Sequence, residues 1–152
     1  MTIQPLNDLQ IDEVWEQVIR MAINVLIVDD SGVMRAMILK AMRMSGLPIG
    51  EVHQAANGKG GLDVLDQHWI DLVIVDINMP VMNGEEMIDC MKEHPEMRDI
   101  PIVVISNEGS KRRIERLQRK GARFIHKPFT PEIIRDTVKD LTGVGVSDER
   151  TN

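Results

Sequence analysis

The chain has 152 residues, of which 43% are hydrophobic and 28% charged, as is usual for one globular domain. Its net charge of -6 argues against a general nucleic-acid-binding surface and a polybasic membrane tether, and no apolar run reaches the roughly 20 residues of a membrane span. The single cysteine, Cys90, cannot form an internal disulfide and the acidic N-terminus lacks signal-peptide blocks, so we expect a cytoplasmic protein.

Residues 1–22 form an N-terminal extension for which the pattern predicts one amphipathic helix. Asn7 and Gln10 resemble a capping pair. An apolar stripe follows at helical spacing, made of Ile11, Val14, Trp15, Val18, Ile19 and Ala22. We expect a helix over residues 8–20 that packs on the domain or on another chain. Alternatively, Met21 is the natural start, because "MAINVLIVDD" is a typical beginning for the domain that follows.

From residue 24 onward, short apolar segments alternate with helical patterns. Runs rich in Val, Ile and Leu predict strands over residues 24–30, 51–56, 71–76, 100–106 and 122–126. Helical spacing and capping residues predict helices over residues 31–46, 57–69, 84–94, 110–121 and 130–143. Such alternation favours an α/β domain with a parallel sheet covered by helices on both faces. We expect this domain to span residues 23–142, with a flexible tail over residues 143–152.

Polar side chains follow the predicted strands at the points where the strands end. Asp29 and Asp30 close the first strand, Asp76 the third and Ser106 the fourth, and Lys127 follows the fifth. Because the carboxyl ends of parallel strands meet at one edge of a sheet, we expect these side chains to converge there.

Three converging carboxylates need a cation. At about 5 Å and an effective dielectric near 20, each pair repels by on the order of 3 kcal/mol. Mg²⁺ favours carboxylates, waters and a phosphate oxygen. His53, His68, His94 and His126 show no zinc-ligand spacing, so we expect no softer metal. Acids, a lysine and a hydroxyl together indicate a phosphoryl-transfer site with an aspartate nucleophile.

Four segments in order resemble the receiver domains of two-component response regulators, most closely the stand-alone chemotaxis-type regulators. They are "VLIVDDS", "DINMPVMNG", "VVIS" and "GARFIHKPF", within residues 23–141. The resemblance implies a flavodoxin-like, doubly wound sheet of five parallel strands in the order 2-1-3-4-5, with five helices besides the N-terminal one.

The resemblance also implies roles for the acidic residues. Asp76 would accept a phosphoryl group from the phosphohistidine of a sensor histidine kinase. Asp30, Asp76 and the backbone carbonyl of Asn78 would bind Mg²⁺ directly, and Asp29 would act mainly through a bound water.

Further roles are implied for residues near the phosphoacceptor. Ser106 and Lys127 would bind the phosphoryl oxygens. Ser106 and Phe124 would move together as a switch, exposing the surface of the last two helices and the strand between them to a protein target. Asn78 and Glu108 would tune self-dephosphorylation, and we expect a phosphorylated state that lasts seconds to minutes.

The sequence is compatible with more than one function. Only about ten residues follow the last predicted helix, so we expect no output domain. We also expect no nucleic-acid or membrane partner, and a monomer or weak dimer. The chain is either a chemotaxis-type regulator or a phosphorelay intermediate that passes its phosphoryl group to a histidine phosphotransfer protein. The sequence fits a hydrolase of small phosphoesters less well. Hydrolases with an aspartate nucleophile commonly have a general acid two residues after it, and here that position is Asn78. A scaffold without phosphorylation would not need the full set of site residues.

Overall fold

The structure is a computed structural model that describes residues 3–143. The side chains of residues 18–20 are outside this description, so Val18 and Ile19 of the predicted apolar stripe are not placed. Residues 144–152, which hold nearly all of the predicted tail, also lie outside the described residues.

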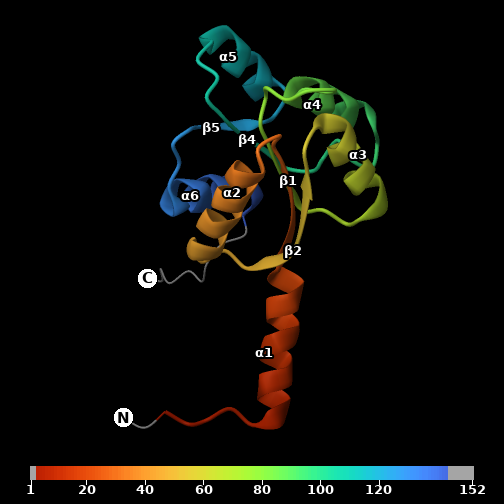
Figure 1. The fold of residues 1–152 in the computed structure, drawn as a ribbon. Helices are drawn as coiled ribbons and strands as arrows, with labels where there is room; N and C mark the ends of the chain where they lie inside the picture. Colours follow the sequence, from red (N-terminus) through yellow and green to blue (C-terminus); the bar gives the residue numbers. More distant parts are fainter. Residues whose placement is uncertain (1–2, 144–152) are drawn as a thin grey trace.

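Five parallel strands form one sheet in the order β2-β1-β3-β4-β5, which confirms the predicted fold class (Figure 1). The strands are β1 (Ile23–Val28), β2 (Ile49–Ala55), β3 (Leu72–Val75), β4 (Ile102–Ser106) and β5 (Arg123–His126). Within residues 3–143 there are six helices: α1 (Asp8–Met21), α2 (Gly32–Met44), α3 (Gly58–Gln67), α4 (Gly84–Glu93), α5 (Lys111–Arg119) and α6 (Pro131–Thr142).

The buried strands supply a core on each face of the sheet, because successive side chains of a strand point to opposite faces. In β1, Val25 and Ile27 join the core beneath α2 and α6, whereas Leu26 and Val28 join the core beneath α3, α4 and α5. These four side chains are at most 1% exposed, so the sheet is a rigid platform for whatever stands at its edge.

Side-chain caps begin the helices that follow the sheet edge. Ser31 Oγ accepts a hydrogen bond from the Met34 amide at 3.1 Å, and Thr130 Oγ1 accepts one from the Ile133 amide at 3.1 Å. Asn83 begins α4 with a reciprocal capping box, in which its side chain accepts from the Glu86 amide. These caps satisfy backbone donors that the first helical turn leaves free, and so they fix where each helix starts.

Helix α1 extends away from the amino end of β1, at the opposite edge of the sheet from the carboxyl ends of the strands (Figure 1). Asn7 and Gln10 cap it reciprocally at 2.8 and 3.0 Å, as predicted. Ile11, Val14 and Trp15 are 39%, 45% and 60% exposed. The prediction that this stripe packs on the domain is therefore wrong for these side chains, and packing on another chain stays a prediction.

None of the helices within residues 3–143 has both the length and the apolar character needed to cross a membrane.

Candidate functional site

The three acidic residues lie just beyond the carboxyl ends of β1 and β3, at the strand ends where the sequence pattern predicted them. The Asp29 amide donates to the Ala55 carbonyl at 3.1 Å, and the Asp76 amide donates to the Val28 carbonyl at 3.0 Å. The hydrogen-bond ladder of the sheet thus continues through both backbones, while their side chains point out at its carboxyl edge. Asp29 is 1% and Asp76 8% exposed, whereas the neighbouring Asp30 is exposed.

Asp29, Asp30 and Asp76 form a group of three carboxylates. One oxygen of each lies within 4.8 Å of the other two. Carboxylates at this separation repel one another by on the order of 3 kcal/mol per pair at an effective dielectric near 20. The donors are all hard oxygens and one of them faces solvent, so the set fits a small divalent cation that keeps some of its waters, such as Mg²⁺.

Lys127 reaches the same acids from the end of β5. Its Nζ lies 3.3 Å from Asp29 Oδ2 and 3.6 Å from Asp76 Oδ2, and its side chain is 12% exposed. Burial raises the pKa of the Asp29 carboxyl, against the hydrogen bond from the Ser31 amide and the attraction of Lys127, which lower it. The Lys127–Pro128 peptide bond at the end of β5 is cis.

Hydrogen bonds connect four residues into a polar rim beside the acids: Ser106, Glu108, Arg113 and Asn78. Ser106 is fully buried at the end of β4, and its Oγ accepts from the Glu108 amide at 3.2 Å. Arg113 of α5 then joins two residues predicted to tune dephosphorylation: its Nη1 lies 3.0 Å from Glu108 Oε1 and 3.4 Å from Asn78 Oδ1. No sequence pattern indicated where this arginine lies.

Gly84 allows the chain to turn closely past the phosphoacceptor candidate. Its amide donates to the Ile77 carbonyl at 2.8 Å, and a Cβ at this position would lie 2.1 Å from the Asp76 carbonyl oxygen. Only glycine permits this approach. In the loop before it, Val81 has φ of 69°, an unusual conformation for a β-branched residue.

Phe124, the predicted switch aromatic, lies on the edge strand β5 with its side chain half-buried. It packs against the core beneath α3, α4 and α5, and its ring meets that of His126 edge-on at 4.7 Å. A hollow of about 560 Å³ lies beside Phe124, between α5, β5 and α6. The residues that line this hollow are Gln118, Arg123, Phe124, Asp136, Thr137 and Asp140.

The basic helix α5 is partly neutralised by acids of α4. Arg116 Nη2 donates to Glu85 Oε1 at 2.7 Å, and Lys120 Nζ lies 3.1 Å from Glu85 Oε2 and 2.6 Å from Asp89 Oδ1. The hydrogen bond from Arg116 lowers the pKa of Glu85 to about 2. These pairs join the two helices next to the acidic edge, and the sequence pattern did not reveal them.

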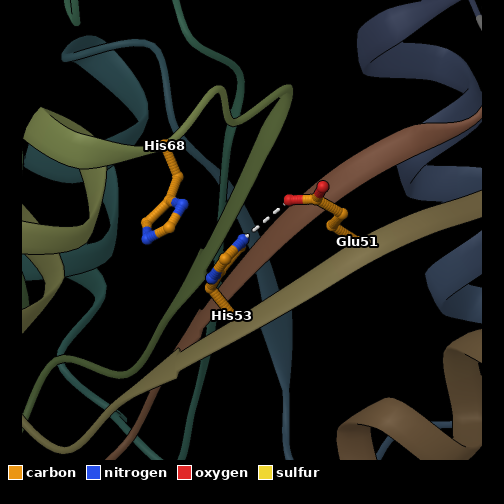
Figure 2. A group of neighbouring side chains, drawn as sticks. All are labelled: Glu51, His53 and His68. Atoms are coloured by element: carbon orange, nitrogen blue, oxygen red, sulfur yellow. Dashed lines mark hydrogen bonds and ion pairs between the residues drawn. The ribbon is translucent and has the colours of Figure 1, made fainter.

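A second group of potential metal-ligand side chains lies on β2 and at the end of α3, made of Glu51, His53 and His68 (Figure 2). The sequence spacing of the histidines did not indicate that His53 and His68 lie together. Spacing could not show it, because one histidine is on a strand and the other follows the next helix.

Most of the chain is similar to known proteins. The family model for the response regulator receiver domain matches residues 25–139. A chemotaxis protein CheY homolog of Campylobacter jejuni is 32% identical over 122 residues, which cover 79% of this chain and 92% of that protein.

Two further proteins are also similar to most of this chain. The two-component response regulator ORR3 of rice (Oryza sativa) is 37% identical over 110 residues, covering 71% of this chain and 82% of that protein. The solved structure of Vibrio cholerae chemotaxis protein CheY4 is 30% identical, with a TM-score of 0.70, and the match covers 79% of this chain and 98% of that one.

Proposed function

The chain belongs to the response regulator receiver domain family, and from this premise we propose that it is a signalling phosphoacceptor whose acceptor residue is Asp76. The observation that carries the proposal is the meeting of Asp29, Asp30, Asp76 and Lys127 at one sheet edge. Three acids and one lysine from distant parts of the chain fit the charge distribution of a phosphoryl group held beside a cation.

In the proposed reaction, a carboxylate oxygen of Asp76 attacks the phosphorus of a phosphohistidine. The new O–P bond forms as the N–P bond breaks, and the released imidazole of the kinase takes up a proton. One Asp76 oxygen accepts from the Ile77 amide at 2.8 Å, which orients the carboxylate. The Oδ2 atom is the one nearest Lys127 Nζ and is the attacking oxygen we propose.

Lys127 and Ser106 would hold the incoming phosphoryl oxygens. Lys127 Nζ already lies within 3.6 Å of the attacking oxygen, so it can neutralise negative charge there as the bond forms. Ser106 is positioned by β4 and by its hydrogen bond with the Glu108 amide, and we propose that its hydroxyl turns toward the phosphoryl group.

Asp29, Asp30, Asp76 and the carbonyl of Asn78 would hold Mg²⁺, with Asp29 acting through water. The bound ion supplies charge neutralisation to the phosphoryl oxygens. The oxygen-only donor set and the exposure of Asp30 support this choice of cation.

Phosphorylation would be read by a protein target at the surface formed by α5, β5 and α6. Ser106 of β4 pairs with His126 of β5, and Val104 pairs with Phe124, so we propose that a movement of Ser106 is passed along β5 to Phe124. The hollow beside Phe124 gives a partner side chain a place to enter. We propose that the protein acts in this way in the cytoplasm, as a monomer or weak dimer, in chemotaxis-type signalling.

Asn78 and Glu108 would shorten the phosphorylated state to seconds or minutes. Both flank the acid pocket and both contact Arg113, so they are held at its rim rather than free in solvent. Polar groups held there can orient an attacking water.

The proposal is tested by incubating the protein with Mg²⁺ and acetyl phosphate, comparing wild type with Asp76→Asn. We expect label on the wild type alone, loss of that label within minutes after the donor is removed, and capture of a protein target by the labelled form only. Consumption of acetyl phosphate without labelling would indicate a hydrolase instead. Efficient transfer of the label to a histidine phosphotransfer domain would favour a relay role over a chemotaxis-type one.

A further inference from the structure

Three ligand-bearing side chains meet on the edge strand β2 and at the end of α3. Glu51 and His53 are two residues apart on β2 and therefore point to the same face of the sheet. His53 Nε2 lies 3.1 Å from Glu51 Oε1, and the ring of His68 stacks on that of His53 with centroids 4.0 Å apart (Figure 2). One ligand atom of each residue lies within 4.8 Å of the other two.

The fold holds both histidines on regular elements. His53 pairs with Leu26 of the inner strand β1, so its backbone is fixed by the sheet. His68 ends α3 as its C-cap, and its amide donates to the Val64 carbonyl at 2.9 Å. Ligands on such elements approach a metal with little loss of backbone freedom.

The segment after His68 is also tied down. Trp69 Nε1 donates to Asp71 Oδ1 at 2.8 Å, and Asp71 Oδ2 accepts from the Asn24 amide at 2.8 Å. The direction in which the chain leaves α3 is therefore set by contacts on both sides of His68.

Two imidazoles and one carboxylate form a donor set unlike that of the acidic edge. Imidazole nitrogen suits zinc, copper and nickel, whereas Mg²⁺ prefers oxygen ligands alone. Two histidines and one glutamate are also sufficient to bind zinc while leaving one coordination position for water. Glu51 and His68 are exposed, so an ion can enter from solvent without opening the core.

We propose that Glu51, His53 and His68 form a second metal site, which binds a divalent transition-metal ion of the zinc, copper or nickel type. The ion joins β2 to the end of α3 and leaves the acidic edge free for a harder cation. The proposed site shares no residue with the phosphoacceptor site. A failed test of one proposal would therefore leave the other unaffected.

Because the metal ion binds the folded chain and not the unfolded one, it should raise the thermal stability of the protein. At metal concentrations near one hundred times the dissociation constant, the midpoint of unfolding should rise by roughly 5–10 °C for a domain of this size. Removal of one ligand should weaken binding by at least about tenfold, since even outer-sphere partners of metal ligands contribute that much.

The test is a calorimetric titration of the full chain with Zn²⁺ in excess Mg²⁺, comparing wild type with Glu51→Gln, His53→Gln and His68→Gln. The matched control is His94→Gln, because His94 is the C-cap of α4 as His68 is of α3. We expect one saturable Zn²⁺ site that each of the three variants weakens at least tenfold and that the control retains. Glu51→Gln keeps the exposed side chain's shape and so separates a lost ligand from a lost fold.

A second readout uses the neighbouring indole. In a Trp15→Phe background Trp69 is the one tryptophan of the sequence, and Cu²⁺ bound at His68 should quench its fluorescence saturably. Wild type without saturable Zn²⁺ binding, or equal loss of binding and quenching in His94→Gln, would overturn the proposal and leave the cluster as a packing contact between α3 and β2.

Discussion

Replacing Lys127 by methionine tests whether the lysine ammonium and a metal ion neutralise the same acids. Lys127 Nζ lies 3.3 Å from Asp29 Oδ2 and 3.6 Å from Asp76 Oδ2. At an effective dielectric near 20, each attraction is on the order of 5 kcal/mol, and the repulsion between the two carboxylates is on the order of 3–4 kcal/mol. The variant keeps the repulsion and loses both attractions.

Breaking a buried ion pair costs about 3–5 kcal/mol, but one acid can take up a proton when its partner cation is removed. We therefore expect Lys127→Met to lower the free energy of unfolding by about 2–3 kcal/mol at neutral pH without Mg²⁺. The same change removes a competing cation from the acids. We expect Mg²⁺ to bind about tenfold more tightly, so saturating Mg²⁺ should restore about 1.4 kcal/mol of the lost stability.

The assay is urea unfolding followed by far-ultraviolet circular dichroism, with and without Mg²⁺, together with calorimetry of Mg²⁺ binding. Lys111→Met is the matched control, because Lys111 is exposed at the start of α5 and should change stability by less than about 0.5 kcal/mol. If Lys127→Met binds Mg²⁺ no more tightly than wild type, or loses the same stability whether or not Mg²⁺ is present, the electrostatic reasoning is refuted.

Three further changes test other parts of the structure. Glu85 has a folded pKa of about 2, below its ordinary 4.5, so its charged form stabilises the fold fully above pH 4.5 and progressively less as the pH falls toward 2. Glu85→Gln should therefore cost about 1–2 kcal/mol at neutral pH after allowance for the exposure of Arg116, and urea titrations should show this difference vanishing over that acidic range. Gly84→Ala places a Cβ 2.1 Å from the Asp76 carbonyl oxygen, so it should cost about 1–3 kcal/mol in thermal melts and slow labelling by acetyl phosphate; an unchanged melting curve would contradict the contact. Asn78→Ala should lengthen the labelled state several times in a decay assay, and an unchanged lifetime would remove Asn78 from the dephosphorylation step.

The acidic edge could be predicted because it depends on the sheet rather than on side-chain detail. Asp29 and Asp76 each follow an apolar run, and parallel strands carry whatever follows them to the same edge. Lys127 joins them from 98 residues beyond Asp29, by the same rule. The side-chain roles assigned to these residues stay proposals, since they rest on the resemblance.

Contacts between elements could not be predicted in the same way. Arg113 bridges Asn78 and Glu108 only because α5 packs with that side chain over the rim of the site. His53 and His68 meet because α3 runs back along β2, and their separation of fifteen positions carries no metal-ligand signature. Such partners depend on the angle at which a helix crosses the sheet, which periodicity does not encode.

The N-terminal helix shows a different limit. Its apolar stripe correctly predicted α1, because helical spacing reports local conformation. The same spacing does not say what covers the stripe, and Trp15 is 60% exposed in the structure.

Mass spectrometry of peptides from protein treated with acetyl phosphate and Mg²⁺ shows directly whether Asp76 is the phosphoacceptor. We predict a single phosphoryl group on the peptide that contains Asp76, absent when Mg²⁺ is removed by a chelator. Label on any other side chain, or undiminished labelling of Asp76→Asn, would show that Asp76 is not the phosphoacceptor.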